Sequence, residues 1–137
     1  MTINEIQDQI IDDFSFFDDW MEKYEYIIDL GKNLPLIDDA YKVDDYLIRG
    51  CQSRVWLHAD TVDGKVVFTA DSDAVITKGI IGLLVEVLSN QSAEDIANSE
   101  LYFIDQIGLK EHLSPNRSNG LLSMVKQMKM YGVALLN

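Results

Sequence analysis

The chain has 137 residues and a mass of 15.6 kDa, the usual size of a domain with one hydrophobic core. Its 23 acidic and 11 basic residues give a formal net charge of −12. This charge argues against binding to nucleic acid or to an anionic membrane, because both need a basic footprint. A single cysteine, Cys51, excludes an internal disulfide and cannot alone hold a zinc ion or an iron–sulfur cluster. We therefore expect one domain over residues 1–137 with no metal site.

Neither targeting nor membrane insertion is indicated by the sequence. Residues 1–20 lack a basic start followed by an uncharged apolar stretch, so we expect no signal peptide. The longest apolar run, residues 80–88, is about half a membrane span and is interrupted by Glu86. These features predict a cytoplasmic protein in a reducing compartment, where a cysteine stays a free thiol.

Acidic residues are concentrated in the first third of the chain. Residues 1–45 contain 13 acids and 3 bases, whereas residues 46–137 contain 10 acids and 8 bases. After Glu111 the only charged residues are three cations, Arg117, Lys126 and Lys129. The acidic part either steers a basic partner or is a solvated face that aids solubility, and the sequence leaves both interpretations open.

Two amphipathic helices are predicted at the start of the chain. Apolar residues recur at spacings of three and four from Ile3 to Phe17, which is typical of a helix with one buried face. Asp19 followed by Glu22 fits a capping box at the start of a second helix. Gly31 is expected to end that helix in a left-handed conformation.

The hydrophobic period then changes from about 3.6 to two, which predicts an antiparallel hairpin. Residues 36–50 look irregular, and apolar positions then alternate with outward-facing ones over residues 55–59. Asp63-Gly64 marks a tight turn, and residues 65–70 form the second strand.

A strongly apolar helix over residues 75–88 is expected to be the central buried helix, capped by the Asp71-Ser72-Asp73 run. Gly79 and Gly82 each cost about 1 kcal/mol against alanine, so we expect both to pack closely against another element.

Shorter helices are predicted near Ser92 and over residues 100–107, and a last helix begins at Ser114-Pro115. The buried side of this last helix is expected to consist of Leu121, Leu122, Val125, Met128 and Leu135. The order along the chain of helices, then a small antiparallel sheet, then helices predicts an α+β fold, a two-layer domain in which the sheet packs against the helices.

Most catalytic patterns are missing from the sequence. Cys51, His58 and His112 are its only soft metal ligands and are far apart along the chain. No run fits a phosphate-binding loop or the GxSxG motif of serine hydrolases. Asp–Asp doublets are common, but capping of helix ends explains them. Cys51 is therefore the remaining candidate functional group.

Cys51 is expected to lie where a loop enters the first strand. Gly50 lets the backbone adopt a positive φ and lets another segment approach closely. Arg49 and Arg54, two and three residues away, favour the thiolate if they face the sulfur. From these residues alone, Cys51 is either a small buried side chain or a nucleophile.

Residues 50–56 (GCQSRVW) resemble the GCQSxVW signature of the SufE family of sulfur-acceptor proteins. Three further segments resemble patterns of the same family in the same order. They are WxEKYxYIIxLGxxLP at residues 20–35, DSDAxIxKG at residues 71–79 and HL(S/T)PxRSxG at residues 112–120. The resemblance covers nearly the whole chain.

This resemblance implies a function in sulfur transfer. Members of the family accept sulfur from a SufS-type cysteine desulfurase, a pyridoxal-phosphate (PLP) enzyme that carries a persulfide on its own cysteine. Cys51 is then the persulfide acceptor, and a SufB-type iron–sulfur scaffold complex receives the sulfur. The resemblance implies no cofactor on this chain and a SufE/IscU-like fold. The scaffold role of IscU-type proteins does not transfer, because those scaffolds use several cysteines.

Seven residues within or beside the matching segments are expected to support Cys51 or to contact the partner. They are Arg49, Gly50, Gln52, Arg54, Asp73, His112 and Arg117. We expect Asp73 to cap the helix that it precedes, with positioning of the Cys51 loop as the alternative. Arg117 is near a helix start, where the helix dipole disfavours a cation, so a contact with the partner or the loop is expected.

Two other functions remain open at this stage. The chain could activate a desulfurase by docking alone, with a dispensable cysteine, or could be a thiol-dependent redox enzyme. The absence of a second cysteine argues against a dithiol mechanism. For the carrier, we expect the loop of residues 48–53 to shelter Cys51 until a partner binds, because a persulfide is easily reduced or oxidised.

Overall fold

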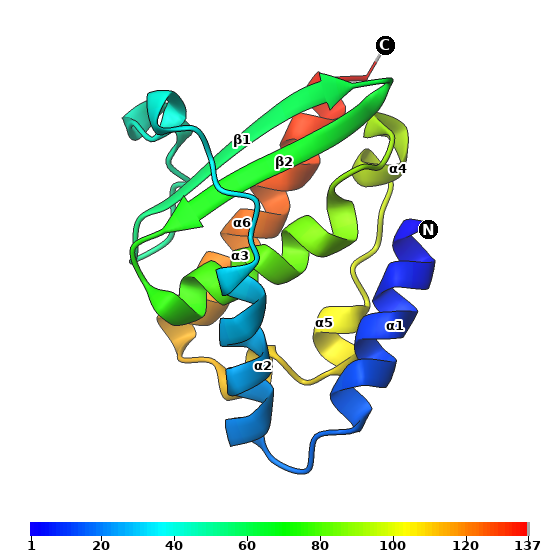
Figure 1. The fold of residues 1–137 in the computed structure, drawn as a ribbon, viewed down its shortest axis with the longest axis vertical. Coiled ribbons are helices and arrows are strands. Elements are labelled where there is room, and N and C mark those ends of the chain that lie inside the picture. Colours follow the sequence, from blue (N-terminus) through cyan, green and yellow to red (C-terminus); the bar gives the residue numbers. More distant parts are fainter. Residues whose placement is uncertain (137) are drawn as a thin grey trace.

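Helices and one antiparallel hairpin make up the computed structural model, which describes residues 1–136. The helices and strands in chain order are α1 (Ile3–Ser15), α2 (Trp20–Lys32), β1 (Val55–Val62), β2 (Lys65–Ser72), α3 (Val75–Leu88), α4 (Ala93–Ala97), α5 (Phe103–Gln106) and α6 (Pro115–Ala134). Short 3-10 turns lie at η1 (Asp39–Tyr41), η2 (Asp44–Tyr46) and η3 (Lys110–His112). The hairpin forms one layer, and α3 and α6 run beneath it (Figure 1). The expected α+β class is confirmed.

The hairpin pairs β1 with β2 around the predicted Asp63-Gly64 turn. Val55 lies opposite Ser72, Val62 lies opposite Lys65, and the turn residues Asp63 and Gly64 both have positive φ. A two-residue turn of this kind matches the natural twist of two antiparallel strands. The inner side chains of β1 and β2 are buried, which gives the sheet one face in the core.

The outer face of β1 is covered by the segment that precedes the Cys51 loop. The Tyr41 ring stacks on His58 with centroids 3.9 Å apart, and Tyr46 meets His58 edge-on. Lys42 and Lys78 both pair with Asp71, at 2.7 Å and 3.4 Å. These contacts tie the irregular segment of residues 36–48 to the hairpin and to α3.

As predicted, α3 is the central buried helix. Its glycines allow the backbone of α2 to pack closely against it. A Cβ on Gly79 would overlap the Ile27 carbonyl, and a Cβ on Gly31 would lie 2.9 Å from the Gly79 nitrogen. The prediction that Gly31 ends α2 was wrong, because the helix continues to Lys32. Gly31 instead permits backbone-to-backbone contact between two helices. Asp19 begins α2 as expected and accepts a hydrogen bond from the Glu22 N–H at 2.9 Å.

A buried glutamine joins α1 to the middle of the chain. Gln7 is fully buried, its amide donates to the Glu100 carbonyl at 3.0 Å, and its side-chain oxygen accepts from the Phe103 N–H at 3.1 Å. Both polar ends of the side chain are therefore satisfied, which removes the penalty of burying it. α1 docks on α3 and α5 through this contact and its apolar face.

α6 is the longest helix among residues 1–136, and it presents two different faces. Leu121, Met124 and Met128 are buried in the core. Leu122, predicted to be buried, is 49% exposed and lies on the opposite face. That prediction was wrong because Leu122 lies about 100° round the helix from Leu121 and about 160° from Met124, outside the arc of α6 that faces the core.

Within the described part of the chain, none of the helices combines the length and the apolar character that crossing a bilayer requires.

Candidate functional site

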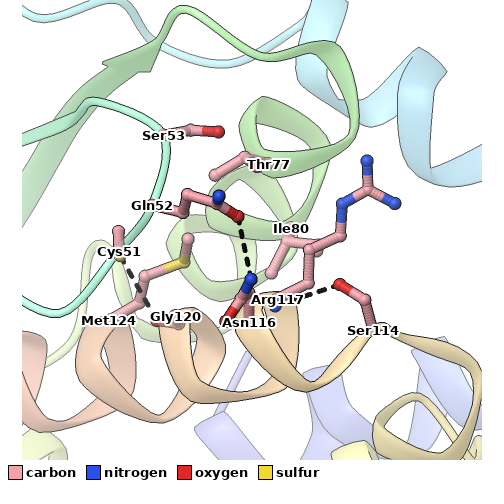
Figure 2. Close-up of a pocket in the computed structure, with 10 residues that line it drawn as sticks. All are labelled: Cys51, Gln52, Ser53, Thr77, Ile80, Ser114, Asn116, Arg117, Gly120 and Met124. Atoms are coloured by element: carbon pink, nitrogen blue, oxygen red, sulfur yellow. Dashed lines mark hydrogen bonds between the residues drawn. The ribbon is translucent and has the colours of Figure 1, made fainter.

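The Cys51 loop, residues 49–54, lies between η2 and β1 and rests on α6 (Figure 2). Gly50 has a φ of +93°, and a Cβ at this position would overlap the Ser123 hydroxyl on α6. The expected need for glycine is confirmed on both counts, conformation and space. Gly50 therefore allows the backbone of the loop to pack closely against α6.

The other end of the loop is held by the residues that precede α3. The Asp73 carboxylate accepts from the Arg54 N–H at 3.1 Å, and the Ser72 hydroxyl donates to the Arg54 carbonyl at 2.8 Å. The expectation that Asp73 caps α3 was wrong, since Ala74 is the N-cap and no side chain caps it. The alternative, a loop-positioning role, is the one that these contacts describe.

Cys51 is partly buried and packs against the hydrophobic core. Its thiol donates to the Gly120 carbonyl with 3.6 Å between sulfur and oxygen. A Cβ on Gly120 would lie 3.5 Å from the sulfur, so α6 passes directly beside it. Burial raises the pKa of the Cys51 thiol, because a thiolate is poorly solvated in such surroundings. The free protein therefore holds the cysteine mainly as the neutral thiol.

A pocket of about 300 Å³ opens beside Cys51. Its lining comes from the loop, α3 and the N-terminal half of α6, namely Cys51, Gln52, Ser53, Thr77, Ile80, Ser114, Asn116, Arg117, Gly120 and Met124 (Figure 2). Polar and apolar side chains both contribute to the lining. The pocket therefore has room for an additional atom on the sulfur.

A second contact closes the loop onto α6. The Asn116 amide donates to the Gln52 side-chain oxygen at 3.1 Å, across the pocket opening (Figure 2). Both side chains are exposed, so this bond can open without unfolding the core. Asn116 is not among the expected site residues; it stands at the variable position between Pro115 and Arg117 in the matching segment.

The three arginines expected near the site lie at different places. Arg117 lines the pocket, but its guanidinium points away from Cys51 (Figure 2). Arg49 borders a separate groove on the other side of the loop, and Arg54 is exposed. Neither Arg49 nor Arg54 lowers the pKa of Cys51 in this state, because burial is the only cause of its shift and raises it; the stabilisation of the thiolate, which depended on these arginines facing the sulfur, is therefore not found here.

His112 does not line the pocket beside Cys51. Its ring stacks on Trp20 with centroids 3.8 Å apart, and its Nδ1 lies 3.1 Å from the Gly108 carbonyl. The Tyr24 hydroxyl donates to the His112 carbonyl. These contacts describe a residue that joins η3 to α2.

Within residues 1–136, no three His, Cys, Asp or Glu side chains are grouped closely enough to hold a metal ion. The site is thus a lone thiol, sheltered beside a small pocket, on a loop fastened at Gly50, Gln52 and Arg54. Fold and site together define an α+β domain that carries one protected cysteine.

Comparison with known proteins shows the family to which this domain belongs. Residues 8–132 match the model of the SufE family, described as an Fe–S metabolism associated domain, so the chain belongs to the SufE family. SufE-like proteins of Rhizobium meliloti and Rhizobium etli are each 42% identical to it over 127 residues. The match covers 89% of this chain and 91% and 86% of those relatives.

Two more distant similarities extend this result. SufE-like protein 1 of Arabidopsis thaliana, named chloroplastic/mitochondrial, is 42% identical over 108 residues, which are 78% of this chain and 29% of that protein. The solution structure of a hypothetical protein from Thermus thermophilus superposes with a TM-score of 0.78 at 21% identity. It covers 94% of both chains and supports the fold alone.

Proposed function

We propose that Cys51 accepts sulfur as a persulfide from a SufS-type PLP-dependent cysteine desulfurase, and that the sulfur then passes to a SufB-type scaffold for iron–sulfur cluster assembly. The observation that carries the proposal is the position of the chain's single thiol, within the family motif and beside a pocket with room for one more sulfur atom. A function in Fe–S metabolism agrees with the family description.

The chemistry needs one thiolate and no change in net oxidation state. The Cys51 thiolate attacks the outer sulfur of the desulfurase persulfide, a new S–S bond forms on Cys51, and the bond to the desulfurase cysteine breaks. The proton that Cys51 loses balances the thiolate that leaves on the desulfurase. Since burial raises the pKa of Cys51, the reacting form is scarce until docking changes its surroundings.

Transfer therefore requires the loop to move. Cys51 is half-buried in the free protein, whereas an attacking sulfur must come within bonding reach of the partner's persulfide. We propose that desulfurase binding releases the loop of residues 48–53 and presents the thiol. Hydrogen–deuterium exchange should show faster exchange in this loop when the desulfurase is added, and unchanged exchange would contradict the proposal.

We propose three different roles for the residues around Cys51. Gly50, Gln52 and Asp73 position the loop through the contacts described above. Arg117, together with the exposed Arg49 and Arg54, is available to the partner. For His112 we propose a structural part only, because its ring is occupied by Trp20. The expected cytoplasmic location fits a free thiol and remains part of the proposal.

One experiment separates the carrier from an activator that only docks. The protein is incubated with a SufS-type desulfurase and cysteine, and its intact mass is then measured. The carrier gains the mass of one or more sulfur atoms, and Cys51→Ser gains none. If Cys51→Ser still stimulates the desulfurase and the natural protein gains no mass, the docking activator is the correct function.

A further inference from the structure

A second groove lies on the opposite side of the Cys51 loop from the pocket. It has a volume of about 340 Å³ and runs between residues 45–49 and α6. Its lining shares no residue with the Cys51 pocket. Ser123, which meets Gly50, belongs to the groove wall, so this groove borders the back of the same loop.

The surface of α6 beside the groove carries apolar side chains that do not pack into the core. Leu122, Met130 and Val133 are 49%, 53% and 58% exposed. At about 100° per residue these positions fall on one side of the helix, opposite the buried Leu121 and Met124. Exposed apolar side chains gathered on one helix face, rather than scattered singly, mark an interaction surface.

The same surface is positively charged, in contrast to the protein as a whole. Arg49 and Lys126 line the groove, and Asp45 is the one acid in its lining. Lys129 lies outside the lining, about 60° round α6 from Lys126, on the side of the helix that carries Leu122 and Val133. None of these three cations forms an ion pair within residues 1–136, although Lys32, Lys42, Lys78 and Lys110 do. On a chain of net charge −12, they are therefore free to meet carboxylates of another molecule.

We propose that this groove is a second docking site, which binds an acidic segment of a partner protein whose carboxylates alternate with apolar side chains. The apolar side chains would cover Met130 and Val133, and the carboxylates would pair with Arg49, Lys126 and Lys129. Because the groove and the Cys51 pocket share no lining residue, a segment bound here leaves the pocket open. The binding itself does not depend on the proposed sulfur chemistry.

A peptide titration tests the proposal. The probe is a synthetic peptide of Glu and Leu in a helical repeat about four turns long, and the control peptide has Gln in place of every Glu. Isotope-labelled full-length protein is observed by nuclear magnetic resonance. The Glu peptide should shift the amide signals of Arg49, Ser123, Lys126 and Met130, and the Gln peptide should bind about tenfold more weakly.

Exposed side chains serve as variants, so the fold is preserved and the unbound spectrum verifies it. Lys126→Glu and Met130→Ser should each weaken binding of the Glu peptide, by about tenfold for the charge reversal. Lys65→Glu, an equal charge change at the hairpin end, should not. Cys51→Ser, which cannot accept sulfur, should bind the peptide normally, so this test can fail independently of the proposed function.

Three results would overturn the proposal. Shifts that cluster away from the groove would exclude it as the site, and equal binding of the two peptides would exclude recognition of carboxylates. Groove signals that move with protein concentration alone would show that a second copy of the chain, through its acidic residues 1–45, is the occupant instead of a partner protein.

Discussion

Asn116 donates a hydrogen bond to Gln52 over 3.1 Å and so fastens the Cys51 loop to α6 from outside the core. The loop is also held through its backbone at Gly50 and Arg54, and through the Cys51 thiol, which donates to the Gly120 carbonyl. The Gln52–Asn116 bond is therefore the contact that can break most readily when the cysteine has to be presented.

Removing this bond should make Cys51 more reactive without unfolding the protein. An exposed hydrogen bond contributes about 1 kcal/mol, so Asn116→Ala should raise the rate of Cys51 alkylation by iodoacetamide about fivefold. Asn119→Ala, at an exposed position in the same helix, is the matched control and should leave the rate unchanged. Equal rates in both variants would mean that the bond does not hold the loop.

The pH dependence of Cys51 reactivity should show its burial. Because burial raises the pKa of the thiol, the midpoint of the alkylation rate against pH should lie higher in the folded protein than in the same protein unfolded in urea. A folded midpoint equal to or below the unfolded one would mean that a nearby charge outweighs burial.

The same shift makes the stability of the fold depend on pH. A raised pKa means that the fold favours the neutral thiol, so this stabilisation is complete below the unfolded pKa, about 8.5, and is lost as the pH rises through the folded value. The free energy of unfolding in urea should therefore fall at alkaline pH more for the natural protein than for Cys51→Ala. A difference that stays constant with pH would contradict this.

Loss of the Asp73 carboxylate should loosen the start of β1. Asp73→Ala leaves the Arg54 N–H without its acceptor, and the free energy of unfolding should fall by about 1 kcal/mol. Asp73→Asn keeps an acceptor oxygen of the same shape and should lose less. Asp18→Ala, an exposed aspartate elsewhere, controls for the change in net charge. If Asp73→Asn and Asp73→Ala were equally destabilised, the hydrogen bond would not be the cause.

Two glycines on the same face of α3 should respond very differently to alanine. A Cβ on Gly79 would overlap the Ile27 carbonyl, so Gly79→Ala must push α2 away and should cost about 3 kcal/mol. Gly82→Ala meets its nearest atom, the Leu30 carbonyl oxygen, at 3.3 Å, and the better helix propensity of alanine offsets part of that strain. Thermal unfolding of both variants tests the difference, and similar melting temperatures would contradict it.

Local patterns in the sequence were sufficient for the order of the helices, the hairpin with its Asp63-Gly64 turn, and Cys51 itself. Those features depend on periodicity, turn chemistry and a motif, all of which are properties of neighbouring residues. The predicted roles of Gly31 and Asp73 failed for one shared reason. Each residue type suits a helix end, but here each contacts a segment far away in the chain, and sequence pattern alone does not show such contacts.

In the candidate site, too, features set by neighbouring residues were predicted and contacts between distant segments were not. Its motif pointed to Cys51, and Gly50 behaves as expected. Asn116 was missed because its partner, Gln52, is 64 residues away in the sequence. Arg49 and Arg54 are close to Cys51 along the chain but face elsewhere, because residues that flank a loop residue do not share its direction.

The buried Gln7 also has a consequence for how the chain is made. Besides Asn4 in its own helix, its hydrogen-bond partners are Glu100 and Phe103, which lie 93 and 96 residues further along. During synthesis on the ribosome, α1 emerges first, but the side-chain oxygen of Gln7 has no donor until Phe103 has followed. Closing so long a loop slows folding, since its entropy is lost before any contact compensates. A chain truncated before residue 100 would therefore keep only the bond between Gln7 and Asn4 and would leave the side-chain oxygen of Gln7 without a donor.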